Sequence, residues 1–419
     1  MPYPKTLRIR QTFERPVVRD VPAAVRAALE RLDLGRTVRP GHTVALTAGS
    51  RGIANIPAVL RAAAAFLKGL GARPFLVPAM GSHGGGTAEG QRELIESYGI
   101  TEEAVGVPIR ASMETVQVGT TPDGCPVLLD RHASQADHIG VVARIKPHTG
   151  FHGPVESGLL KMMLIGLGKH KGALLYHRVL LEQPYDKVVR SVGRTMRANA
   201  SIAFGLALVE NAYDETALVE GVLPEDFEPS EEKLLARARS VLAQLPYRSA
   251  DLLVIDEIGK NVSGSGMDTN VVGRKRAPCS AGPGPDQPTM RLIFVRGLTD
   301  KTHGNAAGIG LADFTTTRLV QEMDYRATVI NCLTAGYPEG ANLPVHFASD
   351  REVIEAALAI LGTRRPEEAR VMRIRNTLEL EVVEMSEPCL NNGSPRTRFE
   401  PLEPARSLAF DAAGNLPPL

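Results

Sequence analysis

Apolar and polar positions along the first half of the chain fall into blocks that predict strands and helices in turn. Short apolar blocks predict strands, and longer blocks with apolar residues three and four positions apart predict helices. Strands are predicted at 43–48, 74–78, 138–145, 202–209 and 216–222, and helices at 56–70, 87–98, 185–198 and from an N-cap at Ser230 to near Pro246. The block 138–145 is apolar without alternation, which is typical of a parallel strand buried on both faces. The alternation predicts βαβ units and a parallel sheet.

The second half repeats this alternation on a smaller scale. Strands are predicted at 252–256, 292–295, 327–333 and 378–383, and helices at 315–323 and 351–361. The segments 259–274 and 280–288 are longer than ordinary connections, which favours functional or mobile loops. We therefore predict two α/β domains with mostly parallel sheets, a cofactor-binding and catalytic domain at 1–246 and a domain at 247–419 that closes over the substrate. The active site is expected in the cleft between them.

Composition sets the broad class of the protein. A chain of 419 residues is expected to form two domains. A net charge of +1 with 43% hydrophobic and 23% charged residues is typical of a globular protein, with no basic surface for nucleic acid or membrane. The four cysteines lie more than fifty residues apart, which excludes local zinc or iron–sulfur motifs. With no apolar signal segment at the N-terminus, a cytoplasmic location is expected.

Histidines concentrate in the first domain, where seven of the ten fall between positions 83 and 177. His83 lies in the glycine-rich segment 81–87, directly after a predicted strand and before a helix. The carboxyl end of a parallel strand is where α/β sheets bind ligands, and a glycine-rich turn before a helix offers backbone N–H groups to an anion. A turn that is glycine-rich for backbone geometry alone is the alternative. Arg51 follows the preceding strand and is suited to binding a carboxylate or phosphate, or to lying on the surface.

The most informative block begins at the end of the predicted strand 138–145. It reads Arg-Ile-Lys-Pro-His-Thr-Gly-Phe-His-Gly over 144–153, followed by Ser-Gly-Leu-Leu-Lys over 157–161 and Leu-Tyr-His over 175–177. Here the sequence resembles the nickel-pincer lactate racemase family, which has a Pro-His segment, then a lysine, then a histidine sixteen residues later. Arg51 and His83 also occur in the family order.

The resemblance implies a role for each matching residue. Lys161 would anchor the cofactor through a thioamide, and His177 would be the axial nickel ligand. His83 and His148 would be the paired acid and base, with Arg51 as a catalytic anion-binding group. Cofactor contacts are expected from Lys161, His177, Ser50, Gly84, Gly85, Gly166 and Gly168. In the second domain, Lys260 and Asn261 are expected in a loop that closes over the substrate, with a solvated loop as the alternative.

The implied function is a racemase or epimerase that inverts the C2 hydroxyl carbon of a small 2-hydroxy acid. The implied cofactor is the nickel-pincer nucleotide, pyridinium-3,5-bisthiocarboxylic acid mononucleotide with nickel, supplied by separate biosynthetic enzymes. It would take and return a hydride while the histidines handle the hydroxyl proton. The chain has no tryptophan, whereas the lactate racemase pocket has an aromatic wall, so a longer or sugar-derived acid is expected in place of lactate.

Two other functions remain open at this point. One is a zinc metallohydrolase with ligands from His83, His148, His152 and His177, although no helical H-x-x-x-H pair with a glutamate base is present. The other is a protein that binds the pincer nucleotide without turning over a substrate. His152, between Phe151 and Gly153, is a pocket residue or a packing residue of the turn.

Overall fold

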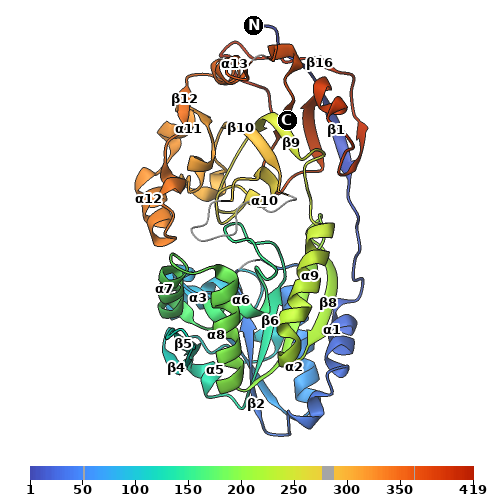
Figure 1. The fold of residues 1–419 in the computed structure, drawn as a ribbon. Coiled ribbons are helices and arrows are strands. Elements are labelled where there is room, and N and C mark those ends of the chain that lie inside the picture. The colour runs from blue at the N-terminus through green and yellow to red at the C-terminus, as the bar shows by residue number, and fades with distance from the viewer. Residues whose placement is uncertain (51, 276–286, 363) are drawn as a thin grey trace. The chain divides into compact units, whose positions relative to one another are not determined.

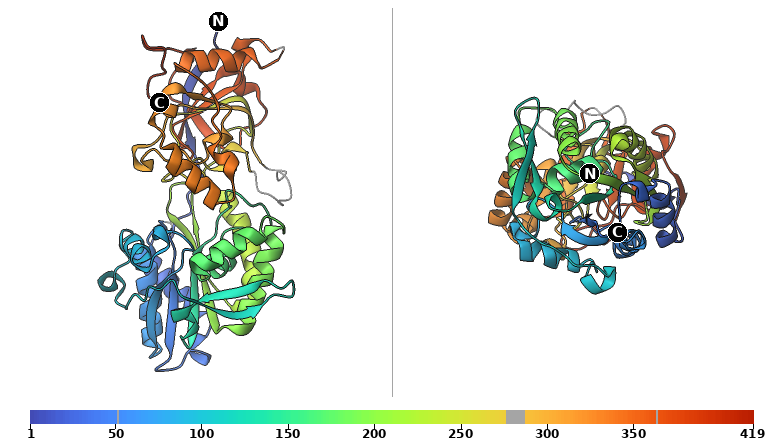
Figure 2. Two further views of the ribbon diagram at one scale, coloured as in Figure 1. Left: turned by 90° about the vertical axis from the view of Figure 1, so that its left-hand side faces the viewer. Right: turned by 90° about the horizontal axis from the view of Figure 1, so that it is seen from below.

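The computed structural model describes residues 1–50, 52–275, 287–362 and 364–419, and the chain divides into two compact units (Figures 1 and 2). The N-terminal unit is Glu14–Leu242. The C-terminal unit contains Met1–Phe13 and the described residues from Ala243 onward. Among the described residues, no helix combines the length and the apolar character needed to cross a bilayer.

The N-terminal unit is built on a five-stranded sheet with the order β3-β2-β6-β7-β8. These strands are β2 (Thr43–Ala48), β3 (Arg73–Pro78), β6 (His138–Arg144), β7 (Ile202–Glu210) and β8 (Thr216–Val222). β3, β2, β6 and β7 are parallel to one another, and β8 is antiparallel to β7. The predicted α/β fold class is confirmed, and each of these strands lies within two residues of its predicted bounds.

Helices cover both faces of this sheet because its strands are apolar on both faces. The helices are α1 (Val21–Glu30), α2 (Ile56–Gly69), α3 (Ala88–Glu96), α4 (Glu102–Val105), α5 (Arg131–Ser134), α6 (Leu159–Lys161), α7 (Lys169–Val179), α8 (Tyr185–Asn199) and α9 (Phe227–Val241). In β6, Val141 and Ala143 join the core under α8 and α9, whereas Val142 joins the core under α1 and α2. Successive side chains of a strand point to opposite faces, which produces two core layers.

Two local features of this unit differ from the sequence prediction. The hairpin of β4 (Thr115–Thr120) and β5 (Pro126–Asp130) was not predicted. The prediction that Ser230 caps a helix is wrong, because α9 already begins at Phe227 with Asp226 as its N-cap residue. Pro229 is tolerated there since the first turn of a helix does not need its backbone N–H groups.

The C-terminal unit contains a nine-stranded mixed sheet in its described residues, with the order β12-β11-β10-β9-β13-β14-β1-β15 and β16 beside β1. The strands are β1 (Lys5–Thr12), β9 (Ser249–Ile255), β10 (Thr289–Val295), β11 (Phe314–Thr316), β12 (Val345–Phe347), β13 (Val371–Ile374), β14 (Val382–Ser386), β15 (Arg398–Pro401) and β16 (Arg406–Ser407). In sheet order, the five strands β12, β11, β10, β9 and β13 are parallel to one another. The pairs that involve β14, β1, β15 and β16 are antiparallel. Residues 1–246 are predicted to form one domain, but β1, at the start of that range, pairs with β14 in the C-terminal sheet. Strand pairing across the whole chain has no local sequence signature.

The helices of this unit are α10 (Thr269–Val272), α11 (Thr317–Glu322), α12 (Tyr325–Thr334) and α13 (Asp350–Ala359). The strand predicted at 327–333 is wrong, because these residues lie in α12. Asp324 caps this helix by accepting the Ala327 backbone N–H at 2.9 Å. Its β-branched residues favour a strand when read locally, but the cap and the helical hydrogen bonds override that preference. Of the two predicted long loops, 259–274 contains α10, and 280–288 lies mostly outside the described residues.

Candidate active site

Three loops that carry predicted site residues leave the same edge of the N-terminal sheet. Ser50 follows β2, His83 follows β3 and His148 follows β6. These strands are neighbours in the order β3-β2-β6 and run parallel. Their carboxyl ends therefore lie side by side, which is where α/β sheets bind ligands.

The His83 ring is held by the neighbouring turn. Its Nδ1 lies 2.5 Å from Ser50 Oγ, and the Tyr98 hydroxyl donates to the Ser50 carbonyl oxygen at 3.0 Å. A hydroxyl both donates and accepts, so Ser50 is compatible with a proton on either nitrogen of His83. The sequence placed Ser50 and His83 at the site, and the structure brings them into contact.

The glycines of this turn have different functions. A Cβ on Gly84, whose φ is +64°, would lie 2.5 Å from the Gly90 carbonyl oxygen, so Gly84 lets the turn pack directly on α3. Gly85 also has a positive φ, of +66°, but no described atom lies within 4 Å of a Cβ placed there. The space on the Cβ side of Gly85 is therefore open, and the cofactor contact expected there stays a prediction.

The His148 ring is fixed by its own loop. The backbone N–H groups of Gly150 and Phe151 donate to His148 Nδ1 at 2.9 and 3.1 Å. With two donors facing Nδ1, the neutral ring carries its proton on Nε2. His148 therefore carries its N–H on Nε2, whereas the contact of His83 with Ser50 is compatible with either tautomer.

Glu156, which the sequence analysis missed, organises the His148 loop. Its buried carboxylate accepts the backbone N–H groups of His148 at 2.5 Å and Gly153 at 3.1 Å, and an Arg239 guanidinium N–H at 2.6 Å. His152 Nδ1 lies 3.2 Å from the same carboxylate, so this histidine belongs to the support of the turn. These four interactions with one carboxylate hold the His148 loop in a single conformation, although the loop contains flexible glycines.

Aromatic stacking supports the same loop from α8. The Phe151 ring stacks with the rings of His148 and Tyr185 at centroid distances of 4.6 and 4.3 Å, and the centroids of His148 and Tyr185 lie 6.1 Å apart. The Tyr185 hydroxyl donates to the Glu156 carbonyl oxygen at 2.5 Å. The only sequence signal for this arrangement was the Phe151–His152 pair beside a glycine.

Lys161 ends the short helix α6 and is followed by a π-helical turn, Met162–Gly166. Its Nζ lies 3.5 Å from Ser157 Oγ. A Cβ on Gly49, in the loop after β2, would lie 3.1 Å from Met162 Cε, and one on Gly81 would lie 3.0 Å from Ile165 Cγ2. The segment after Lys161 thus packs on the loops of both Ser50 and His83. π-Helical turns are frequent at functional sites.

His177 lies on α7, the helix that follows this π turn. His177 is an exposed residue, although enough protein atoms lie around its ring to desolvate it in part. Desolvation lowers the pKa of His177 first, and repulsion from the Lys161 ammonium lowers it further. The two residues therefore lie close enough to interact electrostatically. A neutral imidazole is the form that binds a metal ion.

Gly166 and Gly168 are buried and serve packing. A Cβ on Gly166 would lie 2.5 Å from Met162 Sδ, and one on Gly168 would lie 2.3 Å from the Leu164 carbonyl oxygen. Protein atoms fill the space that a side chain at either position would take, and their expected cofactor contacts stay a prediction. They allow the π turn and α7 to pack closely.

Arg51 lies outside the described residues, but the loop next to it is anchored. Arg144 donates to the Gly52 carbonyl oxygen at 3.3 Å, and Glu210 accepts the Ala54 backbone N–H at 2.6 Å. Arg144 and Glu210 also form an ion pair with each other. This pair links the ends of β6 and β7 to the loop after β2.

Lys260 and Asn261 belong to the C-terminal unit, where they brace their own loop. The Lys260 Nζ donates to the Gly264 carbonyl oxygen at 2.6 Å. The Asn261 Oδ1 accepts the Thr299 hydroxyl at 2.5 Å, and the Lys260 backbone N–H donates to Thr302 Oγ1 at 3.1 Å. Their role in closing over a substrate stays a prediction.

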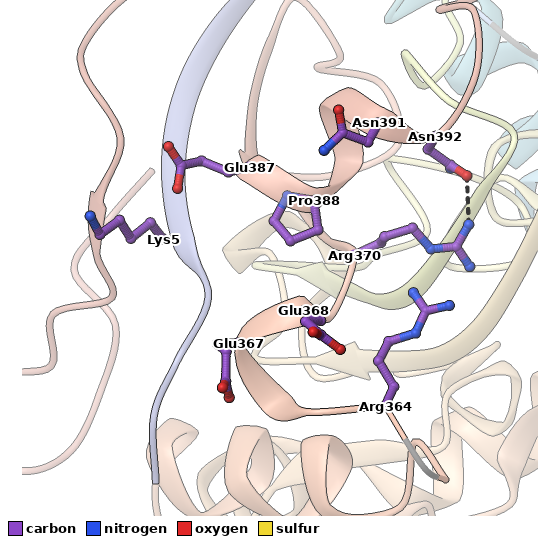
Figure 3. Close-up of a pocket in the computed structure, with 9 residues that line it drawn as sticks. All are labelled: Lys5, Arg364, Glu367, Glu368, Arg370, Glu387, Pro388, Asn391 and Asn392. Atoms are coloured by element: carbon purple, nitrogen blue, oxygen red, sulfur yellow. Dashed lines mark hydrogen bonds between the residues drawn. The ribbon is translucent and has the colours of Figure 1, made fainter.

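A hollow of about 520 Å³ in the C-terminal unit contains none of the candidate residues (Figure 3). It is lined by Lys5, Arg364, Glu367, Glu368, Arg370, Glu387, Pro388, Asn391 and Asn392. Arg364 and Arg370 bind the Asp251 carboxylate at 2.6 and 2.8 Å. Arg370 also donates to Asn392 Oδ1 at 2.6 Å, so these cations serve the fold.

No three His, Cys, Asp or Glu side chains gather as a metal-binding group in the part of the chain that the structure describes. A hydrolytic zinc site needs three protein ligands, so the predicted metallohydrolase gains no support. A nickel ion already bound by its nucleotide needs one imidazole. His177 beside Lys161, with the open backbone at Gly85, fits such a group.

Two comparisons with known proteins relate the N-terminal unit to a family and the chain to a fold. Residues 21–188 match the family model described as the lactate racemase N-terminal domain. The structure resembles the lactate racemase apoprotein from Thermoanaerobacterium thermosaccharolyticum, with a TM-score of 0.53 and 13% sequence identity, over 90% of this chain and 99% of that chain. A search of curated protein sequences gives no match. Residues 21–188 are therefore similar to the lactate racemase N-terminal domain, and the chain has the fold of lactate racemase.

Proposed function

We propose that this protein is a racemase or epimerase that inverts the C2 hydroxyl carbon of a 2-hydroxy acid, with a nickel-pincer nucleotide held by Lys161 and His177. The observation that carries the proposal is the match of residues 21–188, a segment that contains both Lys161 and His177, to the lactate racemase N-terminal domain. The segment after Lys161 packs on the loops that present Ser50 and His83.

Lys161 and His177 are the residues that hold the cofactor in this proposal. The Lys161 amine is the point of covalent attachment, and His177 supplies an imidazole nitrogen to nickel. The lowered pKa of His177 favours the neutral ring, whose lone pair can bind a metal ion. When bound, the nucleotide supplies a reversible acceptor for the C2 hydride.

His83 moves the hydroxyl proton. Its ring faces the Ser50 hydroxyl, which accommodates a proton on either nitrogen, so His83 can take the proton and give it back. His148 has its Nδ1 occupied by two backbone donors and presents Nε2–H. We therefore assign His148 as the hydrogen-bond donor to the substrate C2 oxygen, where the resemblance implied an equal acid and base.

Arg51 is assigned to the anionic carboxylate of the substrate or the phosphate of the nucleotide. Lys260 and Asn261 are assigned to the loop that closes over the bound acid. Because the chain has no tryptophan to form an aromatic wall, we propose a 2-hydroxy acid that is longer than lactate or derived from a sugar.

The test uses protein produced together with the cofactor-synthesis enzymes. Elemental analysis measures nickel, mass spectrometry measures the adduct on the Lys161 peptide, and a panel of chiral 2-hydroxy acids in heavy water reports C2 inversion. We expect about one nickel per chain, inversion of at least one acid, and loss of both in Lys161→Ala and His177→Ala. Nickel without inversion would indicate a cofactor-binding protein. Absence of nickel, or variants that behave like the parent protein, would overturn the assignment.

A further inference from the structure

A fully buried lysine lies beneath the candidate active site. Lys169 is the first residue of α7, has no exposed surface and has a φ of +58°. Burying an ammonium group is costly unless polar groups surround it, and a left-handed backbone disfavours residues other than glycine. Both penalties at one residue indicate that the surrounding structure requires this lysine.

Three acceptors surround the Lys169 ammonium. Its Nζ donates to the Pro78 carbonyl oxygen at the end of β3, at 2.7 Å. It donates to Gln91 Oε1 on α3 at 2.9 Å, and Asp130 Oδ2 at the end of β5 lies 3.4 Å away. Gln91 and Asp130 are fully buried as well. One side chain therefore connects α7, β3, α3 and β5.

Gln91 extends this connection to the His83 turn. Since its Oε1 faces the lysine, its Nε2 faces the turn, where it donates to the carbonyl oxygens of Gly81 at 2.8 Å and His83 at 3.3 Å. The ammonium fixes which end of the amide points at the turn, because only the oxygen accepts. The chain of contacts thus runs from Asp130 through Lys169 and Gln91 to His83.

The same lysine begins the helix that carries His177 (Figure 1). We propose that Lys169 and Gln91 are positioning residues that hold the His83 turn at a fixed position relative to α7. They would thereby fix where His83, the proton-transfer group, lies relative to His177, the cofactor-binding residue on α7. The effect of this placement on catalysis rests on the proposed function. The hydrogen-bonded connection between the His83 turn and α7 does not depend on that function.

Three variants separate the contact between Lys169 and Gln91 from the contacts between Gln91 and the His83 turn. Gln91→Leu removes all contacts of the amide. Gln91→Glu keeps a carboxylate oxygen on the Lys169 ammonium but removes the donor to Gly81 and His83. Lys169→Met combined with Asp130→Asn removes the ammonium without leaving a buried charge unpaired.

The matched control is Tyr176→Phe on the same helix. Tyr176 is fully buried, accepts the Leu128 backbone N–H at 3.0 Å and donates to the Pro126 carbonyl oxygen at 3.3 Å. Its loss removes two buried hydrogen bonds of α7, and no contact with the His83 turn.

Two readouts on the apoprotein need no cofactor or substrate. Hydrogen exchange reports the amides of His83, Gly86 and Thr87, and NMR titration of labelled histidine reports the His83 ring. We expect about tenfold faster exchange and a shifted His83 titration in both Gln91 variants and the double variant. Tyr176→Phe should change neither. If the Gln91 variants match this control in both measurements, the link is wrong.

Kinetics of the cofactor-loaded protein give the catalytic consequence. A misplaced His83 lowers kcat with little change in KM, and the kcat pH profile should follow the altered His83 titration. If apoprotein measurements change but no acid is inverted by the parent protein, the positioning link stands and the proposed function fails. If inversion occurs and the Gln91 variants keep the parent kcat, the positioning role fails and the function stands.

Discussion

The Glu231 carboxylate accepts the backbone N–H of Leu160 at 3.1 Å, directly before Lys161 in the chain. Glu231 lies on α9 and is 2% exposed. Burial raises its pKa from 4.5 to about 8, against the lowering effect of the Leu160 and Leu159 backbone N–H groups. The segment that presents Lys161 is therefore held by a carboxyl group that is protonated at neutral pH.

This raised pKa predicts how stability depends on pH. Between pH 4.5 and about 8 the unfolded chain ionises Glu231 while the folded chain does not, so the folded state binds more protons. The free energy of unfolding must then fall as pH rises through that window. Glu231→Gln removes the ionisation and should be more stable than the parent at pH 8 by about 1–3 kcal/mol. Calorimetry at pH 5 and pH 8 should show a Tm difference that grows with pH, and a constant difference would contradict the assignment.

Glu156 should be essential for the order of the His148 loop. Glu156→Ala leaves two backbone N–H groups without their acceptor and removes one of the two acceptors of Arg239, so we expect a loss of about 2–4 kcal/mol in stability. The matched control is Glu215→Gln, which disrupts a surface pair with Arg15 and should cost much less stability than Glu156→Ala. Thermal unfolding and NMR of His148 check both, and equal effects of the two variants would refute the structural role.

The two histidines should respond differently to substitution. His148→Gln retains an N–H donor near the position of Nε2, so we expect a loss in kcat of about tenfold to a hundredfold. His83→Gln removes the proton carrier and should cost about a thousandfold or more. The part of the kcat pH profile that reports ionisation of His83 should persist in His148→Gln. Equal losses in the two variants would restore the paired acid and base implied by the resemblance.

The interaction of Lys161 with His177 can be measured without cofactor. Lys161→Met removes the ammonium that lowers the pKa of His177, so NMR titration of the apoprotein should show that pKa rise toward its ordinary value. Lys171→Met is the control, since Lys171 is exposed on the same helix. An unchanged His177 titration in Lys161→Met would show that the two side chains lie too far apart to share a cofactor.

Local pattern predicted most of the N-terminal unit because its elements have strong local signals. The apolar block 138–145 and the glycine-rich turn at His83 each carry their own periodicity or backbone requirement. The position of the Ser50, His83 and His148 loops at one edge of the sheet could also be predicted, because the carboxyl ends of parallel strands lie at the same edge. The helix at 325–334 was missed because its β-branched residues favour a strand when considered alone.

The sequence by itself determined the fold class, the strand ends that carry the histidines and the sixteen-residue offset from Lys161 to His177. Only the tertiary structure decided which distant residues support them. Glu156, Gln91, Lys169 and Glu231 are charged or polar residues that a local pattern assigns to the surface, yet all four are buried. Their burial depends on partners far along the chain, and strand β1 joins the C-terminal sheet for the same reason. Contacts of this kind follow from long-range packing, whereas strands, helices and turns follow from neighbours in sequence.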